Sequence, residues 1–282
     1  MTTHSISVWK LAGQGSEAIS FPDLSSLDAI TRQLPAGFYS TFRTFRHKTH
    51  ALDLEAHLAR LYLPAAKFGI LPSVPSADLR RQLSALLQAF PADEARVRLS
   101  LSMAGQVYLA LEPLKVLPRS VYEQGVRVVS TQVQRETPTL KTTAFIAASQ
   151  RERGLLAAQN IFEGLILHNG RIREGLTSNF FYVRGGKLGT AQRGILNGVT
   201  RREVLRVARA NEIEIVYRAL PVSNLSRIDE AFLTSSSRGI VPIVNVDGAQ
   251  VGSGAVGAIT VRLTILYNAD VEQRVESIWP AR

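Results

Sequence analysis

The sequence predicts an α/β protein with two domains, a smaller α+β domain followed by a larger domain that is richer in strands. In the first third, apolar residues between Asp53 and Lys67 recur at helical spacing. From Val97 to Ser102 apolar and polar residues alternate, which is typical of a half-buried strand. Further along, Asn169-Gly170 separates two short strand-like segments, and this dipeptide favours a tight type I′ hairpin turn.

The small domain is expected over residues 1–116, followed by a linker at 117–122 that lies in a proline-containing polar run. Gly37 to Phe45 is predicted to be a strand, and Ser76 is predicted to cap a helix that carries Leu79, Leu83 and Leu86 on one face. The alternating segment at 97–102 is expected to pair with a returning strand at 107–111.

The larger domain is expected over residues 123–282 and alternates strands with helices. Strands are predicted at 126–129, 164–168, 171–174, 179–183, 213–217 and 230–234. Helices are predicted at 144–158, 200–210 and 256–267. Neither an internal repeat nor a low-complexity segment interrupts this pattern.

Composition narrows the class of protein. With 282 residues, 45% of them hydrophobic and 20% charged, the chain is expected to be globular. It has no apolar run of the roughly 20 residues that span a bilayer, and no signal peptide is predicted, so a cytoplasmic protein without a membrane partner is expected. The absence of cysteine excludes disulfides and thiolate metal sites, and no metal is expected.

A formal net charge of +10 leaves several explanations open. Solvated faces of amphipathic helices account for the basic pairs Arg80-Arg81 and Arg201-Arg202, and attraction for anionic metabolites is the main alternative. A nucleic-acid-binding role has only the charge in its favour, since no aromatic-basic motif accompanies it. No nucleic-acid partner is therefore expected.

Two segments have the chemistry of anion sites. Gly198-Val199-Thr200 is a glycine turn that opens a helix, where free backbone N–H groups and the Thr200 hydroxyl suit a phosphate. The run Thr234 to Gly239 places four hydroxyl residues at a strand end, which also suits an anion. Taken alone, each is more simply explained as an ordinary turn.

Two further residues have the chemistry of a reactive centre. Lys141 lies between Leu140 and the start of an apolar helix, and desolvation of a lysine makes its neutral amine available as a nucleophile. Glu174 follows a strand and precedes polar turn residues. In isolation, Lys141 would be taken as a helix-end lysine and Glu174 as a surface carboxylate.

In order and spacing, these four segments resemble the fold-type IV pyridoxal-phosphate enzymes, namely branched-chain and D-amino-acid aminotransferases and aminodeoxychorismate lyases. The resemblance extends from Lys141 to about Ile259, and in the small domain it rests on Gly37-Phe38-Tyr39 and the segment 55–61. It implies the fold-type IV architecture, pyridoxal 5′-phosphate in the cleft between the domains, and a homodimer that completes the pocket.

The resemblance also assigns roles residue by residue. Lys141 matches the Schiff-base lysine, which also moves the proton, and Glu174 matches the carboxylate on the pyridine nitrogen. The other cofactor residues are those expected at the phosphate: Arg60, Val199, Thr200 and Ser236. Tyr39 and Ser237 match positions that line the substrate pocket.

The sequence departs from the family around the substrate. Met103 stands where some members have a carboxylate-binding arginine. Arg43 lies four residues after Tyr39 and shares its strand face, so we expect Arg43 or Arg98 to recognise a substrate carboxylate, a surface or dimer-interface arginine being the alternative. The expected activity is transamination between an amino acid and a 2-oxo acid. The alternatives are an aminodeoxychorismate lyase, which would release 4-aminobenzoate and pyruvate, and a non-catalytic ligand-binding descendant.

Overall fold

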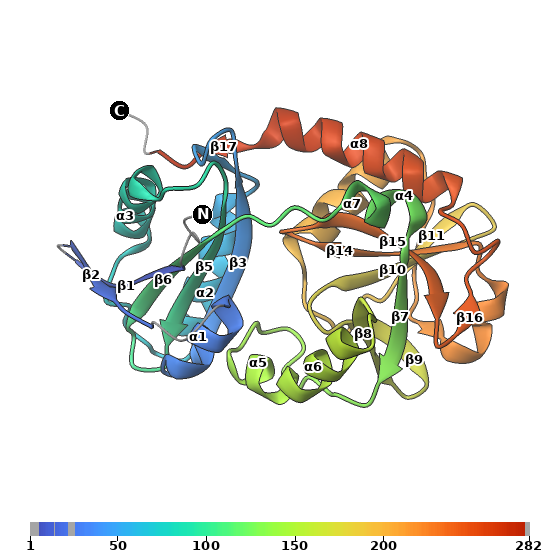
Figure 1. The fold of residues 1–282 in the computed structure, drawn as a ribbon, viewed down its shortest axis with the longest axis horizontal. Coiled ribbons are helices and arrows are strands. Elements are labelled where there is room, and N and C mark those ends of the chain that lie inside the picture. Colours follow the sequence, from blue (N-terminus) through green and yellow to red (C-terminus); the bar gives the residue numbers. More distant parts are fainter. Residues whose placement is uncertain (1–5, 14, 22–25, 280–282) are drawn as a thin grey trace. The chain divides into compact units, whose positions relative to one another are not determined.

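The computed structural model describes residues 6–13, 15–21 and 26–279, and the chain forms two compact units (Figure 1). Unit 1 is built from Met1–Lys115, Leu140–Ala147 and Arg274–Arg282. Unit 2 is built from Val116–Thr139 and Ala148–Gln273. No helix of the described residues is long and apolar enough to cross a membrane.

The bounds of the two units differ from the domains expected at 1–116 and 123–282 in two places. The segment 117–122 is not a linker, because α4 (Arg119–Gln124) begins after Pro118 and the Tyr122 hydroxyl donates to the carbonyl of Arg238 in unit 2 at 3.0 Å. Residues 140–147 and 274–279 lie with unit 1, since strand pairing holds both segments there. Neither pairing has a local sequence signal.

Unit 1 is built on an antiparallel sheet with the strand order β17-β4-β3-β5-β6-β1-β2. The strand predicted at Gly37–Phe45 is present with those bounds, and the segments 97–102 and 107–111 pair as expected. The strands of this sheet are β1 (Ser7–Ala12), β2 (Gly15–Ile19), β3 (Gly37–Phe45), β4 (His50–Ala51), β5 (Ala95–Ser102), β6 (Val107–Pro113) and β17 (Glu276–Ser277).

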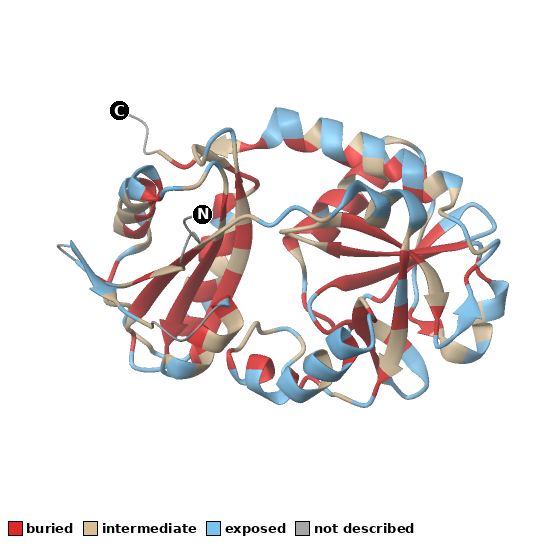
Figure 2. Cartoon of the chain, in the orientation of Figure 1, coloured by how far each residue is buried: buried red, intermediate tan, exposed pale blue. Residues whose placement is uncertain are grey.

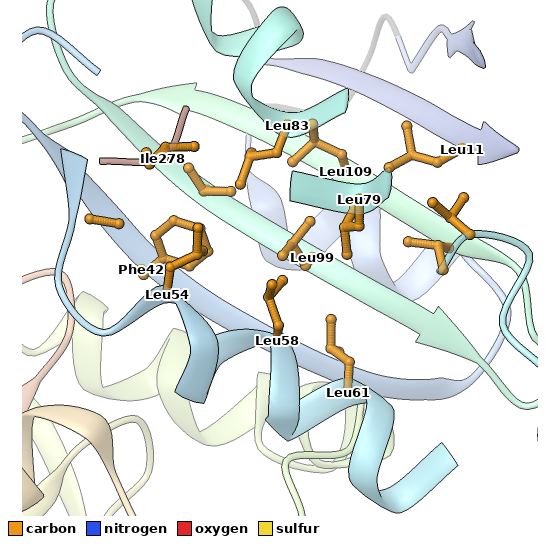
Figure 3. Packing of buried hydrophobic residues seen from close by; sticks show 14 of the residues in the cluster. Leu11, Phe42, Leu54, Leu58, Leu61, Leu79, Leu83, Leu99, Leu109 and Ile278 are labelled. Carbon is orange, nitrogen blue, oxygen red and sulfur yellow. The ribbon is translucent and has the colours of Figure 1, made fainter. Parts of the chain in front are cut away.

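The core of unit 1 joins one face of this sheet to α2 (Leu54–Lys67) and α3 (Ser76–Ala89). Each fully buried leucine stabilises such a core by roughly 1.5–3 kcal/mol. Asp53 caps α2 through the Ala56 N–H at 3.3 Å. Figure 3 shows the apolar side chains of both helices and the sheet in one cluster: Leu11, Phe42, Leu54, Leu58, Leu61, Leu79, Leu83, Leu99, Leu109 and Ile278.

The opposite face of the sheet is covered in part by α1 (Leu27–Gln33), a helix that the sequence patterns did not predict. Leu27 and Ile30 of α1 pack against Val8 and Ala110. The expectation of a half-buried strand at 97–102 is therefore wrong, because Arg98 and the serines that alternate with the apolar residues are buried too.

Unit 2 contains a closed ring of strands. The strands β10, β14, β15, β7, β8 and β9 pair in that order, and β9 pairs again with β10. Buried residues of these strands form the core of the unit, and Figure 2 colours the buried residues red. The ring strands are β7 (Val126–Thr131), β8 (Glu163–His168), β9 (Arg171–Gly175), β10 (Asn179–Arg184), β14 (Glu230–Ser235) and β15 (Gly239–Val246), and the outer strands are β11 (Lys187–Thr190), β12 (Ile215–Tyr217), β13 (Leu220–Pro221) and β16 (Ala249–Gln250).

The predicted hairpin in unit 2 is confirmed. Asn169 and Gly170 join β8 to β9 with φ values of 49° and 66°, the left-handed backbone that a type I′ turn requires at both positions. The helices of the remaining chain are α5 (Ala144–Ala148), α6 (Gln150–Ala158), α7 (Val199–Ala210) and α8 (Ala258–Arg274), with a 3₁₀ turn at Val222–Arg227.

Three helix boundaries differ from the predictions. The single helix expected at 144–158 is two helices, because α5 ends at Ala148 and Ser149 is the N-cap of α6. Ser76 is the first residue of α3 and not its cap, since the carbonyl of Pro75 accepts the first helical bond from Leu79 N. The last helix continues past Tyr267 to Arg274, and Val271 is buried along it.

Candidate active site

Lys141 is held at the edge of β3 in unit 1. The Tyr39 N–H donates to the carbonyl of Lys141 at 2.9 Å, and the Thr143 N–H donates to the carbonyl of Gly37 at 2.9 Å. The segment around Lys141 thus continues the sheet as an added antiparallel stretch, bridged at Phe38. This pairing fixes the backbone of the lysine against a strand that lies about a hundred residues earlier in the chain.

The Lys141 side chain lies beside Tyr39. Its Nζ is 4.8 Å from the centroid of the Tyr39 ring, and the guanidinium carbon of Arg98 is 5.0 Å from the same ring. Since cations are attracted to the face of an aromatic ring, Tyr39 connects the two positive groups. The structure therefore brings together three of the residues that the sequence singled out.

The guanidinium of Arg98 has several protein partners. It donates to Asp28 at 2.6 Å, to the Thr31 hydroxyl at 3.0 Å and, through Nε, to the Thr41 hydroxyl at 3.0 Å. The side chain is 4% exposed. These bonds orient the guanidinium toward α1 and β3.

Arg43 and Met103 lie elsewhere in unit 1. Arg43 shares the strand face of Tyr39 but stands four residues away, about 13 Å at a rise of about 3.3 Å per residue. Its guanidinium carbon is 4.7 Å from the ring of Phe45, and its Nε donates to the Thr44 carbonyl at 3.4 Å. Met103 is exposed in the turn between β5 and β6. The structure does not bring Arg43 to Tyr39.

Arg60 and His57 lie on α2. Burial lowers the pKa of Arg60 to about 10, which leaves the guanidinium charged at neutral pH. Burial, with Arg60 and Lys141 nearby, lowers the pKa of His57 well below its ordinary value. His57 is therefore a neutral imidazole, and its Nδ1 is 2.8 Å from the hydroxyl of Ser40. Sequence analysis did not single out His57.

In unit 2, Glu174 is a buried carboxylate with three donors. Its Oε1 accepts from Arg135 Nε at 2.9 Å. Its Oε2 accepts from the Leu196 N–H at 2.9 Å and from Asn179 Nδ2 at 3.3 Å. The prediction that Glu174 is more than a surface carboxylate agrees with this burial, whereas Arg135, Asn179 and Leu196 were missed. Arg135 is 39 residues from Glu174 in sequence, so no local pattern could have found it.

Glu174, Asn179 and Thr234 lie opposite one another on three neighbouring strands of unit 2. In the strand register, Glu174 on β9 is opposite Asn179 on β10, which in turn is opposite Thr234 on β14. Asn179 also donates to the carbonyl of Leu196 at 2.8 Å. A Cβ on Gly198 would lie 2.1 Å from Asn179 Oδ1, so this close approach of the α7 entry segment requires glycine.

The N-terminus of α7 has the features of an anion site. Gly198 is the N-cap and gives no side-chain hydrogen bond, so the N–H groups of the first turn, including Val199 and Thr200, lack a side-chain cap. Within the described residues, the buried hydroxyls of Thr200 and Thr234 have no hydrogen-bond partner. A buried hydroxyl without a partner costs about 1–3 kcal/mol, which an anion acceptor would offset. These residues fit a phosphate group.

The turn that carries Ser236 and Ser237 is anchored by Arg238. The Arg238 guanidinium donates to Glu163 at 3.0 Å, to the Thr177 hydroxyl at 2.7 Å and to the Ser235 hydroxyl at 3.0 Å. Glu163 is 3% exposed. This network fixes the turn between β14 and β15.

Comparison with known proteins agrees with this chemistry. Residues 37–246 match the family Amino-transferase class IV. A probable branched-chain-amino-acid aminotransferase of Thermotoga maritima is 32% identical over 230 residues, 78% of this chain and 82% of that protein. A D-alanine aminotransferase of Bacillus licheniformis is 26% identical over 266 residues, 87% of this chain and 92% of that protein. Both names are those of aminotransferases, and neither is that of a lyase.

Solved structures share the fold. A putative branched-chain amino acid aminotransferase from Thermotoga maritima superimposes with a TM-score of 0.79 at 27% identity, covering 95% of this chain and 96% of that one. A T.th. branched-chain amino acid aminotransferase with pyridoxamine 5′-phosphate gives 0.80 at 17% identity, with 97% and 98% covered. The expected fold-type IV architecture is thereby confirmed. The match over residues 37–246, which includes Tyr39, Arg60, Lys141, Glu174 and Thr200, shows that the chain belongs to the class IV aminotransferases, a family of pyridoxal-phosphate-dependent enzymes.

Proposed function

We propose that this aminotransferase moves an amino group between an amino acid and a 2-oxo acid, with pyridoxal 5′-phosphate attached to Lys141. The observation that carries the proposal is the surroundings of Glu174, a buried carboxylate with three donors, next to a helix N-terminus whose Thr200 hydroxyl has no partner among the described residues. Bound pyridoxal 5′-phosphate supplies an electron sink for the substrate α-carbon.

Glu174 is suited to keep a pyridine nitrogen protonated. Its side chain is 3% exposed, and hydrogen bonds from Arg135, Asn179 and Leu196 hold the carboxylate in one orientation. Because these donors fix the carboxylate, a ring nitrogen that meets it keeps a defined direction.

Val199, Thr200 and Ser236 are proposed to hold the phosphate, and Arg60 to neutralise it. The first two supply N–H groups at the start of α7, and Thr200 adds a hydroxyl. Arg60 remains charged at neutral pH, since its pKa is about 10. A guanidinium can donate two parallel bonds to a phosphate.

Lys141 is proposed to move the proton at the substrate α-carbon. The pairing of its backbone with β3 and the position of its Nζ over Tyr39 limit the directions that the amine can take. Tyr39 and Ser237 are proposed to line the substrate pocket, and a homodimer is proposed to complete it. Arg98 is proposed to position Tyr39, because its guanidinium is bonded to Asp28, Thr31 and Thr41.

The amino donors that we propose follow the names of the relatives: D-alanine or a branched-chain amino acid. The proposed acceptor is a 2-oxo acid. The purified protein with added cofactor should show an absorbance band near the violet edge of the visible spectrum that borohydride removes. A peptide containing Lys141 should then carry the mass of the reduced cofactor. Turnover with neither donor class, or cofactor mass on another lysine, would overturn the proposal.

A further inference from the structure

Unit 2 contains a second polar region outside the residues described above. In the described part of the chain, two adjoining cavities of about 620 Å³ each share Gln192, Arg193 and Tyr217 as lining residues. The first lies against α7 and the segment that precedes it, and the second against β9 and the end of β12. Neither is lined by Glu174, Val199, Thr200 or Ser236.

Arginines dominate both cavities. The first is lined by Arg193, Arg201, Arg202 and Arg209. The second is lined by Arg193 with Arg171, Arg173 and Arg218. Among the lining residues of the two cavities there is no aspartate or glutamate. The cavities therefore concentrate positive charge on one part of the surface, and a concave surface of one sign attracts ions of the opposite sign.

Most of these guanidiniums bond to neutral groups. Arg171 donates to the Ala219 carbonyl at 3.2 Å, and Arg209 donates to the hydroxyl of Tyr217. Within the residues that the structure describes, no carboxylate pairs with Arg171, Arg193, Arg209 or Arg218. Arg202 differs, since it lies 3.6 Å from Glu203.

One of the arginines is too enclosed to be explained as a solvated surface charge. Arg201 is 6% exposed, and its NH2 group donates to the Ala191 carbonyl at 2.8 Å. Its Nε is buried and has no partner in the described chain, and the same holds for Nε of Arg173. Burial lowers the pKa of Arg201. Glu174 favours the charged form of Arg201 from nearby but forms no ion pair with it in the described chain. Burial of a guanidinium is costly, so an anion in the first cavity would further offset that cost.

A second copy of the chain is a poor occupant. Each copy has a formal net charge of +10, so an arginine-lined surface packed against another copy would be opposed by electrostatic repulsion. A small anion meets no such repulsion. Guanidiniums bind phosphate oxygens through paired donors, and the number of cations here exceeds what one phosphate needs.

We propose that these two cavities form a binding site for a small polyanion with at least two phosphate groups. The ligand spans the wall that the two cavities share, which Arg193 and Tyr217 line. One phosphate lies toward Arg201 and the other toward Arg171 and Arg218. The proposal does not rest on the substrate of the enzyme. Such a site would also explain part of the formal net charge of +10.

The test is calorimetric titration of the cofactor-saturated protein with inorganic tripolyphosphate. Saturation with cofactor keeps the probe away from the α7 N-terminus. The double variant Arg193→Ser/Arg218→Ser should weaken binding at least about tenfold, since two charge-assisted contacts are lost. The matched control Arg127→Ser/Arg151→Ser removes the same charge from exposed positions of unit 2 that line neither cavity, and should change affinity less than about twofold.

Three results would overturn the proposal. The first is no saturable binding of tripolyphosphate by the wild-type protein. The second is equal weakening in both double variants, which would mean that net charge alone binds the probe. The third is displacement of tripolyphosphate by a short duplex DNA at far lower concentration, which would make the surface a nucleic-acid site.

Discussion

Lys141 and Tyr39 are cross-strand neighbours: the lysine Nζ lies 4.8 Å from the centroid of the tyrosine ring, and the Tyr39 N–H donates to the Lys141 carbonyl. Residues opposite each other in an antiparallel pair project to the same side of the sheet. The position of the amine is thus set by β3, and changes to either residue should act on the same step of turnover.

Replacement of Lys141 by alanine should abolish turnover and leave the fold intact. The backbone bonds at 2.9 Å that hold the segment do not involve the side chain, so alanine keeps them. Borohydride treatment of the variant should leave no cofactor attached to the protein, which mass spectrometry can check. Residual turnover together with a covalent cofactor would show that another lysine carries it.

Arg60→Ala and Glu174→Ala should fail in different ways. Loss of a charge-assisted contact to phosphate costs about 1.5–3 kcal/mol, so Arg60→Ala should weaken cofactor affinity by about ten- to a hundredfold and recover much turnover at saturation. Glu174→Ala should retain more affinity but turn over slowly even when saturated. Cofactor titration followed by measurement of kcat separates the two. Normal kcat in saturated Glu174→Ala would remove its electronic role.

Local patterns predicted the parts of unit 2 that are fixed by neighbouring residues. The hairpin at 164–174 depends on positive φ at Asn169 and Gly170, and both residue types tolerate that backbone. The order of the anion segments and of Lys141 and Glu174 was enough to identify the family, which the match over 37–246 confirms.

Contacts between distant segments could not be predicted in this way. Arg135 reaches Glu174 across 39 residues, and Lys141 pairs with a strand that begins at Gly37. Helix α1 was missed, so Arg98 was expected on a half-exposed face, whereas Asp28 of α1 binds it. In each case the contact is made by an element whose position no periodicity in the sequence indicates.

His57 should make the protein less stable as the pH falls. Its pKa in the folded protein lies well below the ordinary value of 6.5, so below that pH the unfolded chain takes up a proton that the folded chain does not. The contribution of His57 to the free energy of unfolding is therefore fully present above about pH 6.5 and is lost as the pH falls below that value. Between about pH 7.5 and about pH 5.5, wild type should lose about 1.4 kcal/mol more than His57→Gln in urea unfolding. Equal losses in both proteins would contradict this.

Glu163→Gln should loosen the turn that carries Ser236 and Ser237. It weakens the bond to Arg238 at 3.0 Å, and the loss of a buried charged acceptor should cost about 1–3 kcal/mol in the free energy of unfolding. Because the loosened turn carries Ser236 and Ser237, the KM for substrate and the Kd for the cofactor should rise in this variant. The control Glu214→Gln breaks an exposed pair with Lys187 and should stay within about 0.5 kcal/mol of wild type. Equal effects in the two variants would argue against the anchoring role.

The last prediction separates two roles for Arg98. If Arg98 positions Tyr39, then Arg98→Met and Asp28→Asn should both raise KM by about five- to tenfold for every amino donor and for 2-oxoglutarate alike, because both variants release the same guanidinium. Direct recognition of a carboxylate would instead raise KM for one dicarboxylate partner in Arg98→Met and leave Asp28→Asn unchanged. Arg43→Ala should have normal kinetics in either case, since its guanidinium packs on Phe45 about 13 Å along the strand from Tyr39. A KM increase confined to 2-oxoglutarate in Arg43→Ala would instead assign the substrate carboxylate to Arg43.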